Sequence, residues 1–471
     1  MAKTPRKDNP VPAEADRSAR TAGLLVATLA SFFTPFMSSS INIALPSIAE
    51  EFALDAVSLS WIATSFLLAA AVFIVPFGRL ADIYGRKRVF STGVIVFTLS
   101  CLAAALSQSG IWLIASRVLQ GIGSAILSAT SMAILTSAYP AQERGKVLGF
   151  QVAAVYTGLS LGPSIGGGLT QYFGWRSIFI FGLPLGVLTM IATIWKLRGE
   201  WAEAKGEEFD VAGAVLFGLS LISLMYGFSR LPQTMGAVLL IVGLAGIAGF
   251  VLWEARVSSP VLDVRLFSLN AVFAFSNLAA FINYSATTAV TFLLSLYLQY
   301  IKGLSPRNAG LILITQPLVM AILSPVAGRL SDKIKPRMLA SIGMSITTIG
   351  LLLLTSLSER TSMTFIVLAL FVLGVGFALF SSPNSNAVMS SVERRYYGVA
   401  SGTLGTMRTT GQMFSMGIAM LLFALFMGQA EITPQLHAQF LKSAGTGFLV
   451  FAILCLGGVF ASLARQKSTR H

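Results

Sequence analysis

Long apolar runs recur along the whole chain and determine its predicted architecture. The segments 211–229 and 231–253, for example, contain no charged residue. About 20 apolar residues in a helix cross the ~30 Å hydrocarbon core of a bilayer. The pattern therefore predicts an all-α integral membrane protein with fourteen transmembrane helices, at residues 21–46, 58–78, 89–108, 111–137, 146–172, 176–196, 210–229, 233–253, 270–301, 306–328, 338–357, 362–388, 397–427 and 441–464.

Basic residues are distributed unevenly between these runs. An even number of spans puts both termini on one side, and Lys and Arg gather in cytoplasmic loops. If the termini are cytoplasmic, all but eight of the 33 basic residues lie on the cytoplasmic side. Two of the eight, Arg117 and Arg408, lie within spans. We therefore expect a multi-pass protein of the cell membrane with cytoplasmic termini, whose first apolar run stays in place as an anchor helix.

The chain also repeats itself. Gly78-Arg79-Leu80-Ala81-Asp82 recurs as Gly328-Arg329-Leu330-Ser331-Asp332, and Glu143-Arg144 recurs as Glu393-Arg394 at the same offset. Parallel repeats of this kind are typical of secondary transporters with a binding site between the halves. We therefore expect a tail at 1–20, a six-helix bundle at 21–200, two additional helices at 201–262, a second six-helix bundle at 263–465 and a tail at 466–471.

Composition narrows the classes of protein that fit. Of the 471 residues, 55% are hydrophobic and 11% are charged, whereas soluble domains are about 25% charged. The net charge of +14 lies in short loops rather than on a soluble domain, so we expect no nucleic-acid partner. The two cysteines lie in apolar runs, and the two histidines lie in a loop and at the C-terminus. We therefore expect no metal site, no cofactor and no enzymatic activity.

Three motifs stand out. The first is the loop Gly78-Arg79-Leu80-Ala81-Asp82-Ile83-Tyr84-Gly85-Arg86-Lys87-Arg88. Gly78 and Gly85 allow a tight connection, and Asp82 can accept hydrogen bonds from Arg86 or from a helix N-terminus. The alternative is a loop whose positive charge only sets topology.

The second motif is the run from Arg117 to Gly123, with Gln120 and Gly121, in the fourth predicted span. A charge at the hydrocarbon centre costs about 2.5–3.5 kcal/mol on insertion scales. We therefore expect Arg117 to face the interior of the bundle. The alternative is an arginine that extends toward the membrane surface from near the outer end of the helix.

The third motif is the most specific and has the spacing G-x8-G-x3-G-P-x2-G-G in the fifth span. Small residues let helix backbones approach closely, and Gly-Pro bends a helix. Generic packing of small residues is the alternative. The fixed positions are Gly149, Gly158, Gly162, Pro163, Gly166 and Gly167.

Together these motifs resemble those of the major facilitator superfamily, specifically its fourteen-helix drug:proton antiporter family. Gly174-Trp175-Arg176 and Asn42-Ile43-Ala44-Leu45-Pro46 are also similar to segments of that branch. The resemblance implies the major facilitator fold and a multidrug or toxic-compound antiporter that works by alternating access. It implies that the first loop, whose second copy includes Gly328 and Asp332, latches the outward-facing state.

The resemblance also implies roles for the other two motifs. Arg117 would act in proton coupling or hold helix packing. The glycine face of the fifth span would pack against the other half and seal the cytoplasmic side.

The chain departs from this family at positions that bear on coupling. Met37 stands where the branch typically carries Asp in its first helix, and Ile83 stands where the family usually has Arg. None of the 19 Asp and Glu residues lies deep within a predicted span, although exchange of a proton for a cation usually needs a buried carboxylate. Proton coupling would then run through groups near the surface, such as Asp82, Glu50 or Glu51, or be absent.

Two arginines and a few polar side chains within spans suggest the preferred substrate. A roomy apolar site with few polar anchors suits amphiphilic compounds, and arginines favour neutral or anionic ones. For each polar residue alone, hydrogen bonding between helices is the more common role. The candidate cavity residues are Asn42, Met37, Tyr156, Asn283, Tyr284, Gln316, Asn384 and Arg408.

We therefore expect a secondary transporter, with a small amphiphilic substrate, the lipid bilayer and protons as its partners. The alternatives are a lipid or metabolite exporter, or a uniporter without proton coupling. A membrane sensor that transports nothing is the alternative of another class, although the longest polar stretches are too short for an output domain.

Overall fold

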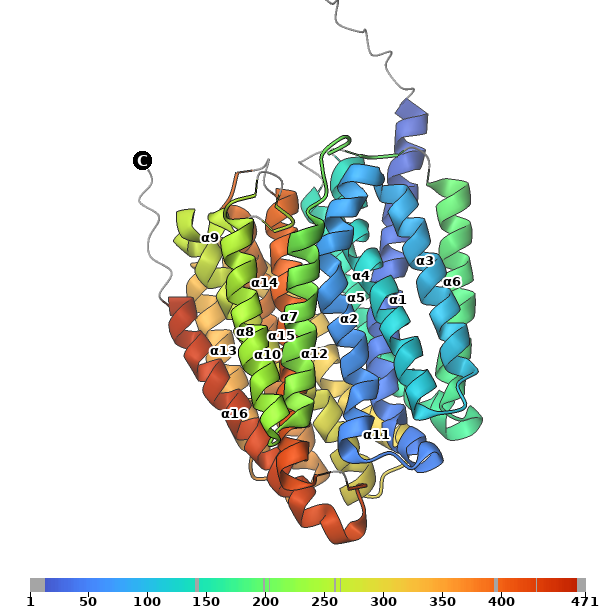
Figure 1. Cartoon of the computed structure of the whole chain (residues 1–471), viewed down its shortest axis with the longest axis vertical. Helices are drawn as coiled ribbons and strands as arrows, with labels where there is room; N and C mark the ends of the chain where they lie inside the picture. Colours follow the sequence, from blue (N-terminus) through green and yellow to red (C-terminus); the bar gives the residue numbers. More distant parts are fainter. Residues whose placement is uncertain are drawn as a thin grey trace, which may run out of the picture.

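The computed structural model describes residues 13–139, 144–197, 200–202, 204–257, 260–262, 264–393, 397–428 and 430–463. Both predicted tails lie largely outside these residues, as do Glu143 and Arg394 of the repeated Glu-Arg pair. The regular elements of the described part are all helices, and they form one bundle of long, roughly parallel helices (Figure 1).

The N-terminal half contains six long helices. They are α1 (Ala13–Phe52), α2 (Ala56–Tyr84), α3 (Arg86–Ala105), α4 (Gly110–Ala138), α5 (Arg144–Phe173) and α6 (Arg176–Lys196). A hairpin of α7 (Val211–Arg230) and α8 (Thr234–Glu254) follows. We call the end of the bundle where α1 begins the terminal end, and the end that carries the α1–α2 connection the distal end (Figure 1).

The C-terminal half repeats the six-helix plan with shorter additions. Its elements are α9 (Arg265–Leu269), α10 (Ala271–Leu296), the π-helix η1 (Tyr297–Ile301), α11 (Pro306–Leu313), α12 (Thr315–Lys333), α13 (Pro336–Leu354), α14 (Met363–Ser390), α15 (Tyr397–Phe426), the 3-10 helix η3 (Pro434–Leu436) and α16 (His437–Leu463).

Side chains just before the helices explain many of the helix starts. Asp55, Ser109, Asp210, Asn270, Ser305 and Ser362 each accept a hydrogen bond from a backbone N–H in the first turn of the helix that follows. These N–H groups have no partner within the helix, so the caps fix where each helix begins.

The end predicted for the first helix was wrong, whereas a later span was confirmed with an internal irregularity. The helix predicted at 21–46 runs on to Phe52, because Pro46 is accommodated inside α1. The span predicted at 306–328 corresponds to one candidate membrane span, Pro306–Ser331, with a local irregularity at Ile314 between α11 and α12. Pro317 has no N–H to donate to the carbonyl four residues earlier, at Leu313, which explains an irregularity at this point.

Thirteen described helices are long and apolar enough to cross a membrane. The remaining predicted span, 146–172, corresponds to α5, whose 30 residues are ample in length. It is rich in glycine and serine and contains Pro163. This composition fits a helix whose surface is covered mainly by other helices rather than by lipid.

The internal repeat reappears in the packing. In the first half, α1 packs against α5 and α6, and α4 packs against α2 and α3. In the second half, α10 packs against α15 and α16 in the same way, and α14 against α12 and α13. The two halves meet along two seams, one between α2 and α15 and the other between α5 and the α11–α12 pair.

Candidate functional site: a polar aromatic cluster between the halves

Side chains from both halves meet near the middle of their helices. Tyr156 of α5 is buried against Met320 of α12 and Phe377 of α14, with Tyr284 of α10 packed alongside. The Tyr156 hydroxyl donates a hydrogen bond to Ser381 Oγ at 3.1 Å. The rings of Tyr284 and Phe377 form an edge-to-face pair with centroids 5.3 Å apart. We call these residues, with Ser385 and Arg408, the central cluster.

Arg408 supplies the positive charge of the central cluster. Its guanidinium donates a hydrogen bond to Ser385 Oγ at 2.6 Å and lies 5.7 Å from the centroid of the Tyr284 ring. Its Nε is buried and has no hydrogen-bond partner. Both of these neighbours are neutral, so the charge is stabilised by a hydroxyl and a ring face rather than by an anion. The arrangement is therefore suited to attract a negatively charged group.

Some members of the central cluster were not predicted from the sequence. Phe377, Ser381 and Ser385 lie on α14 at intervals of four residues, which places them on one face of the helix. That spacing was a usable signal, because it puts two hydroxyl side chains on the same face as an aromatic ring. Met320 gave no such signal.

The remaining predicted cavity residues are dispersed. Asn384 donates to the Ser276 carbonyl oxygen at 3.1 Å, which joins α14 to α10. Asn283 is fully buried in α10, and neither its amide nitrogen nor its amide oxygen has a hydrogen-bond partner. Gln316 is buried near the start of α12. The carbonyl oxygen of Asn42 accepts from Ser295 Oγ at 2.6 Å, where α1 meets α10.

Met37 and Arg117 do not belong to the central cluster. Met37 packs next to Gly182 of α6 and near Cys101 of α3, inside the N-terminal half. Arg117 is 1% exposed and lies between α2, α3 and α4 of the same half. The expectation that both arginines line one cavity is therefore wrong. Only Arg408 lies where the two halves meet.

The surroundings of Arg117 are polar but carry no acidic side chain among the described residues. Its Nε donates to the Ile62 carbonyl oxygen at 3.1 Å, and its guanidinium also donates to Gln120 Oε1 and lies 4.3 Å from the Phe66 ring centroid. Gly121 and Gly123 let α4 approach α2 and α3, because an added Cβ would lie 2.4 Å from the Phe66 oxygen and 2.7 Å from the Phe97 nitrogen, respectively. This motif binds three helices of one half together.

The glycine motif of α5 has two partners. An added Cβ at Gly158, Gly162 or Gly166 would collide with α1. Gly167 instead faces the other half, where its added Cβ would lie 2.5 Å from the Pro306 carbonyl oxygen of α11. A Cβ added to Gly149 would have no atom within 4 Å, so this glycine takes no part in either contact.

The contact between α5 and α11 is reciprocal. An added Cβ on Gly310 would lie 2.1 Å from the Pro163 carbonyl oxygen. Arg307 also donates a hydrogen bond to the Tyr172 hydroxyl at 3.3 Å. These contacts form a seal at the distal end, which carries the α5–α6 connection (Figure 1). Which side of the membrane this end faces depends on the orientation of the termini, so the expected seal on the cytoplasmic side stays a prediction.

Two hydrogen bonds join α1 to the end of α10 and to η1 in the same region. Besides the bond from Ser295 to Asn42, the Gln299 amide donates to the Ile43 carbonyl oxygen at 3.0 Å. The backbone N–H of Ala56 donates to the Ala430 carbonyl oxygen at 3.1 Å. The halves are thus joined through backbone groups at three places near the distal end.

The α2–α3 connection has the geometry that its sequence suggested. Arg86 is buried and donates from Nε and an NH2 group to Asp82 Oδ1, at 2.9 and 2.7 Å. Gly85 has φ +112°, which side-chain-bearing residues rarely adopt. Gly78 packs beside Ala129, and Gly328 of the second copy packs beside Ser382. The side chain of Asp332 lies outside the described residues.

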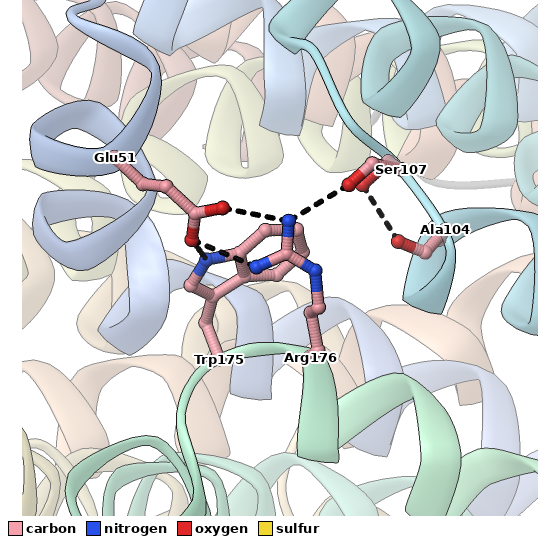
Figure 2. A network of polar contacts seen from close by, with 5 residues as sticks. All are labelled: Glu51, Ala104, Ser107, Trp175 and Arg176. Atoms are coloured by element: carbon pink, nitrogen blue, oxygen red, sulfur yellow. Dashed lines mark hydrogen bonds and ion pairs between the residues drawn. The ribbon is translucent and has the colours of Figure 1, made fainter.

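A network at the distal end was not recognised as such from the sequence (Figure 2). Glu51 accepts two hydrogen bonds from the Arg176 guanidinium, at 2.7 and 2.8 Å, and one from Trp175 Nε1 at 2.7 Å. Arg176 also donates to the Ser107 carbonyl oxygen at 2.8 Å and lies 4.2 Å from the Trp175 ring centroid. Because these residues come from the end of α1, the α3–α4 connection and the start of α6, only the fold brings them together.

The described residues contain no group of three or more His, Cys, Asp or Glu side chains that could hold a metal ion. Arg408 and the tyrosines of the central cluster can bind and orient a small organic molecule, but they do not form a nucleophile–base pair. The arrangement is therefore suited to binding rather than to covalent chemistry.

Comparisons with known proteins agree with this description. The model of the Major Facilitator Superfamily matches residues 27–276 and 276–470. The riboflavin transporter RibZ of Clostridioides difficile is 29% identical and covers 95% of this chain and 97% of its own length. The cephamycin export protein CmcT of Amycolatopsis lactamdurans is 32% identical, with 95% and 94% covered.

A solved structure shows the same fold. It is the inward-facing, unoccupied structure of a bacterial homolog of the human lysosomal transporter Spinster. The TM-score is 0.65 at 19% identity, with 96% of this chain and 99% of the other covered.

Proposed function

Because this chain belongs to the Major Facilitator Superfamily and is therefore a multi-pass membrane transporter, we propose that it exports small amphipathic organic compounds by alternating access. Its preferred substrates are hydrophobic molecules that are neutral or anionic, including drugs and other toxic compounds. The central cluster is the observation that carries this proposal, because Arg408 and aromatic rings from both halves converge there. The family consists of transporters rather than enzymes.

Two further observations support the proposal. One relative is named as a cephamycin export protein and another as a riboflavin transporter, so both names denote the movement of an organic compound. The second is the distal seal between α5 and α11, which closes one end of the seam beside the central cluster. Alternating access requires such a closure at one end at a time.

Proton coupling has only limited support in this arrangement. Asp82 and Glu51, two of the carboxylates considered for coupling, are held by Arg86 and Arg176, respectively. Glu50 is exposed. If the protein is an antiporter, we propose that a carboxylate near a helix end carries the coupled proton. If transport is not coupled to protons, the protein is a uniporter or an exporter of lipids or metabolites.

We expect measurable flux in proteoliposomes that contain the purified protein. The probe is a set of three fluorescent aromatic compounds of similar size, one anionic, one neutral and one cationic. The anionic and neutral compounds should move at least about tenfold faster than the cationic one, since an uncompensated arginine repels a cation in a low-dielectric site. Preference for the cation would refute the proposed substrate class, and no flux of any compound would favour a sensor.

The same vesicles can be used to determine whether a proton gradient drives transport. A pH gradient, alkaline inside or outside, is imposed with the fastest of the three compounds. An antiporter accelerates when protons flow against the substrate, whereas equal rates with and without the gradient identify a carrier without proton coupling.

The orientation has its own test. We propose that both termini are cytoplasmic and that the protein lies in the cell membrane, because most basic residues then face the cytoplasm. A reporter that is active only in the cytoplasm should be active when fused after His471 and inactive when inserted beside Arg230. Activity beside Arg230 would contradict the proposed orientation.

A further inference from the structure

The segment 200–210, which connects α6 to α7, lies across the α2–α3 connection at the terminal end of the bundle. We call the described part of this segment the strap. Three of its contacts use the backbone of the α2–α3 connection. The Trp201 carbonyl oxygen accepts from the Arg86 N–H at 2.9 Å, and the Ala204 N–H donates to the Asp82 carbonyl oxygen at 3.0 Å. Glu200 Oε1 accepts from the Lys87 N–H at 2.8 Å.

Two ion pairs add to these bonds. Glu207 pairs with Arg79, and Glu200 Oε2 lies 3.7 Å from Arg88 Nε. The Arg79 side chain is mostly buried, and that of Arg88 is mostly exposed. The pair with Arg79 is therefore the stronger of the two, because water and salt screen it less.

The position of Glu200 explains a local feature of α3. The residue before that helix is Gly85, which has no side chain to cap the first N–H groups. Glu200 and the Trp201 carbonyl, which come from another part of the chain, accept hydrogen bonds from these N–H groups instead. An added Cβ on Gly85 would lie 2.5 Å from the Glu200 carboxyl, so glycine leaves the room that Glu200 occupies. The α2–α3 connection and the strap are therefore fitted to each other.

The strap leads directly into a helix that touches both halves. Asp210 caps α7, and α7 packs against α2 on one side and α15 on the other. Gly218 of α7 lies against Val72 of α2, and Gly417 of α15 lies against Met225 of α7. When the two halves move relative to each other, α7 cannot keep its position against both. The strap then shifts relative to the α2–α3 connection, or α7 slides along α15.

We propose that Glu200 and Glu207 are positioning residues that hold the α2–α3 connection in the conformation seen here, with the distal end sealed. Their release accompanies opening at the distal end, so the strap sets the balance between the two states of the carrier. This inference rests on alternating access by the proposed transporter, but it does not depend on what the substrate is.

The test compares the double variant Glu200→Gln/Glu207→Gln with Glu208→Gln in the same segment. Glu208 is exposed and makes none of the contacts described. Both variants carry spin labels at cysteines that replace Phe173 and Leu311, two exposed positions on the α5 and α11 sides of the distal seal. Cys101 and Cys455 are replaced by alanine. Pulsed dipolar spectroscopy then measures the distance between the labels in the absence of substrate.

We expect the short-distance, sealed population of the double variant to fall by about three- to tenfold relative to the long-distance population, as the loss of charge-assisted hydrogen bonds would produce. Glu208→Gln should match the parent. The charge exchange Arg79→Glu/Glu207→Arg should restore more of the sealed population than Arg79→Glu alone.

Equal distance distributions in the double variant and Glu208→Gln would overturn the proposal, as would a charge exchange that restores nothing. Size-exclusion chromatography shows whether each variant is folded. The distance measurement needs no transported compound. It therefore tests the role of the strap independently of the proposed export function.

Discussion

Replacing Gly310 by valine is expected to lower the transport rate by at least about tenfold, since overpacking a close contact costs roughly 1–3 kcal/mol. An added Cβ would lie 2.1 Å from the Pro163 carbonyl oxygen, which is backbone and cannot turn aside. The valine would therefore force α11 away from α5 and weaken the distal seal. Initial rates in proteoliposomes measure the loss, and the distance between labels at positions 173 and 311 should increase.

The matched control for this prediction is Gly168→Val in α5. Gly168 is adjacent to Gly167 but has no atom within 4 Å of an added Cβ. Its valine variant should transport within about twofold of the parent, because a surface substitution away from such contacts costs little. If Gly310→Val transports as fast as Gly168→Val, the seal is not needed for transport.

Replacing Arg408 by alanine is expected to reduce transport of an anionic substrate by about tenfold or more while leaving a neutral one much less affected. The reason is that hydrogen bonds to a charged group contribute about 1.5–3 kcal/mol. Arg408→Lys keeps the charge but not the fork of donors, so it should retain part of the preference. The measurement is the ratio of initial rates for the anionic and neutral fluorescent compounds.

Arg117→Ala provides the comparison for Arg408→Ala. Arg117 binds Gln120 and the Ile62 carbonyl inside one half and does not reach the central cluster. Its removal should lower thermal stability, because buried polar partners lose their donor, but should not change the ratio of rates. A ratio that changes in Arg117→Ala, or stays the same in Arg408→Ala, would contradict the assignment of Arg408 as the anion-binding residue.

The architecture could be predicted from the sequence because each membrane-spanning helix is marked by its own residues. Long apolar runs give the spans without reference to any other part of the chain. The motifs repeated at Gly78 and Gly328 indicated two related halves, and the same packing recurs in both. Helix ends were less accurate, since Pro46 does not end α1 but lies inside it.

The candidate site could be predicted only in part. The cost of burying a charge indicates that an arginine faces protein, but it does not indicate which helices surround it. Arg117 and Arg408 are alike in sequence, yet one binds helices of a single half and the other lies between the halves. The Glu51–Arg176 pair joins α1 to the start of α6, a partnership that depends on how the helices are arranged.

The helix that each glycine of α5 contacts could not be predicted from the sequence either. Gly162 and Gly167 are both small residues on one helix, but the first contacts α1 and the second contacts α11. Spacing identifies a surface fitted for close approach without identifying the partner.

The position of the α7–α8 hairpin makes the molecule unequal on its two sides. Since α7 covers the seam between α2 and α15, a compound dissolved in the bilayer finds that seam shielded by an extra pair of helices. The opposite seam, between α5 and the α11–α12 pair, has no such cover from the hairpin. Lipophilic molecules that partition into the membrane before capture would therefore enter sideways through one flank of the carrier, and the lipids bordering that flank would influence which molecules arrive.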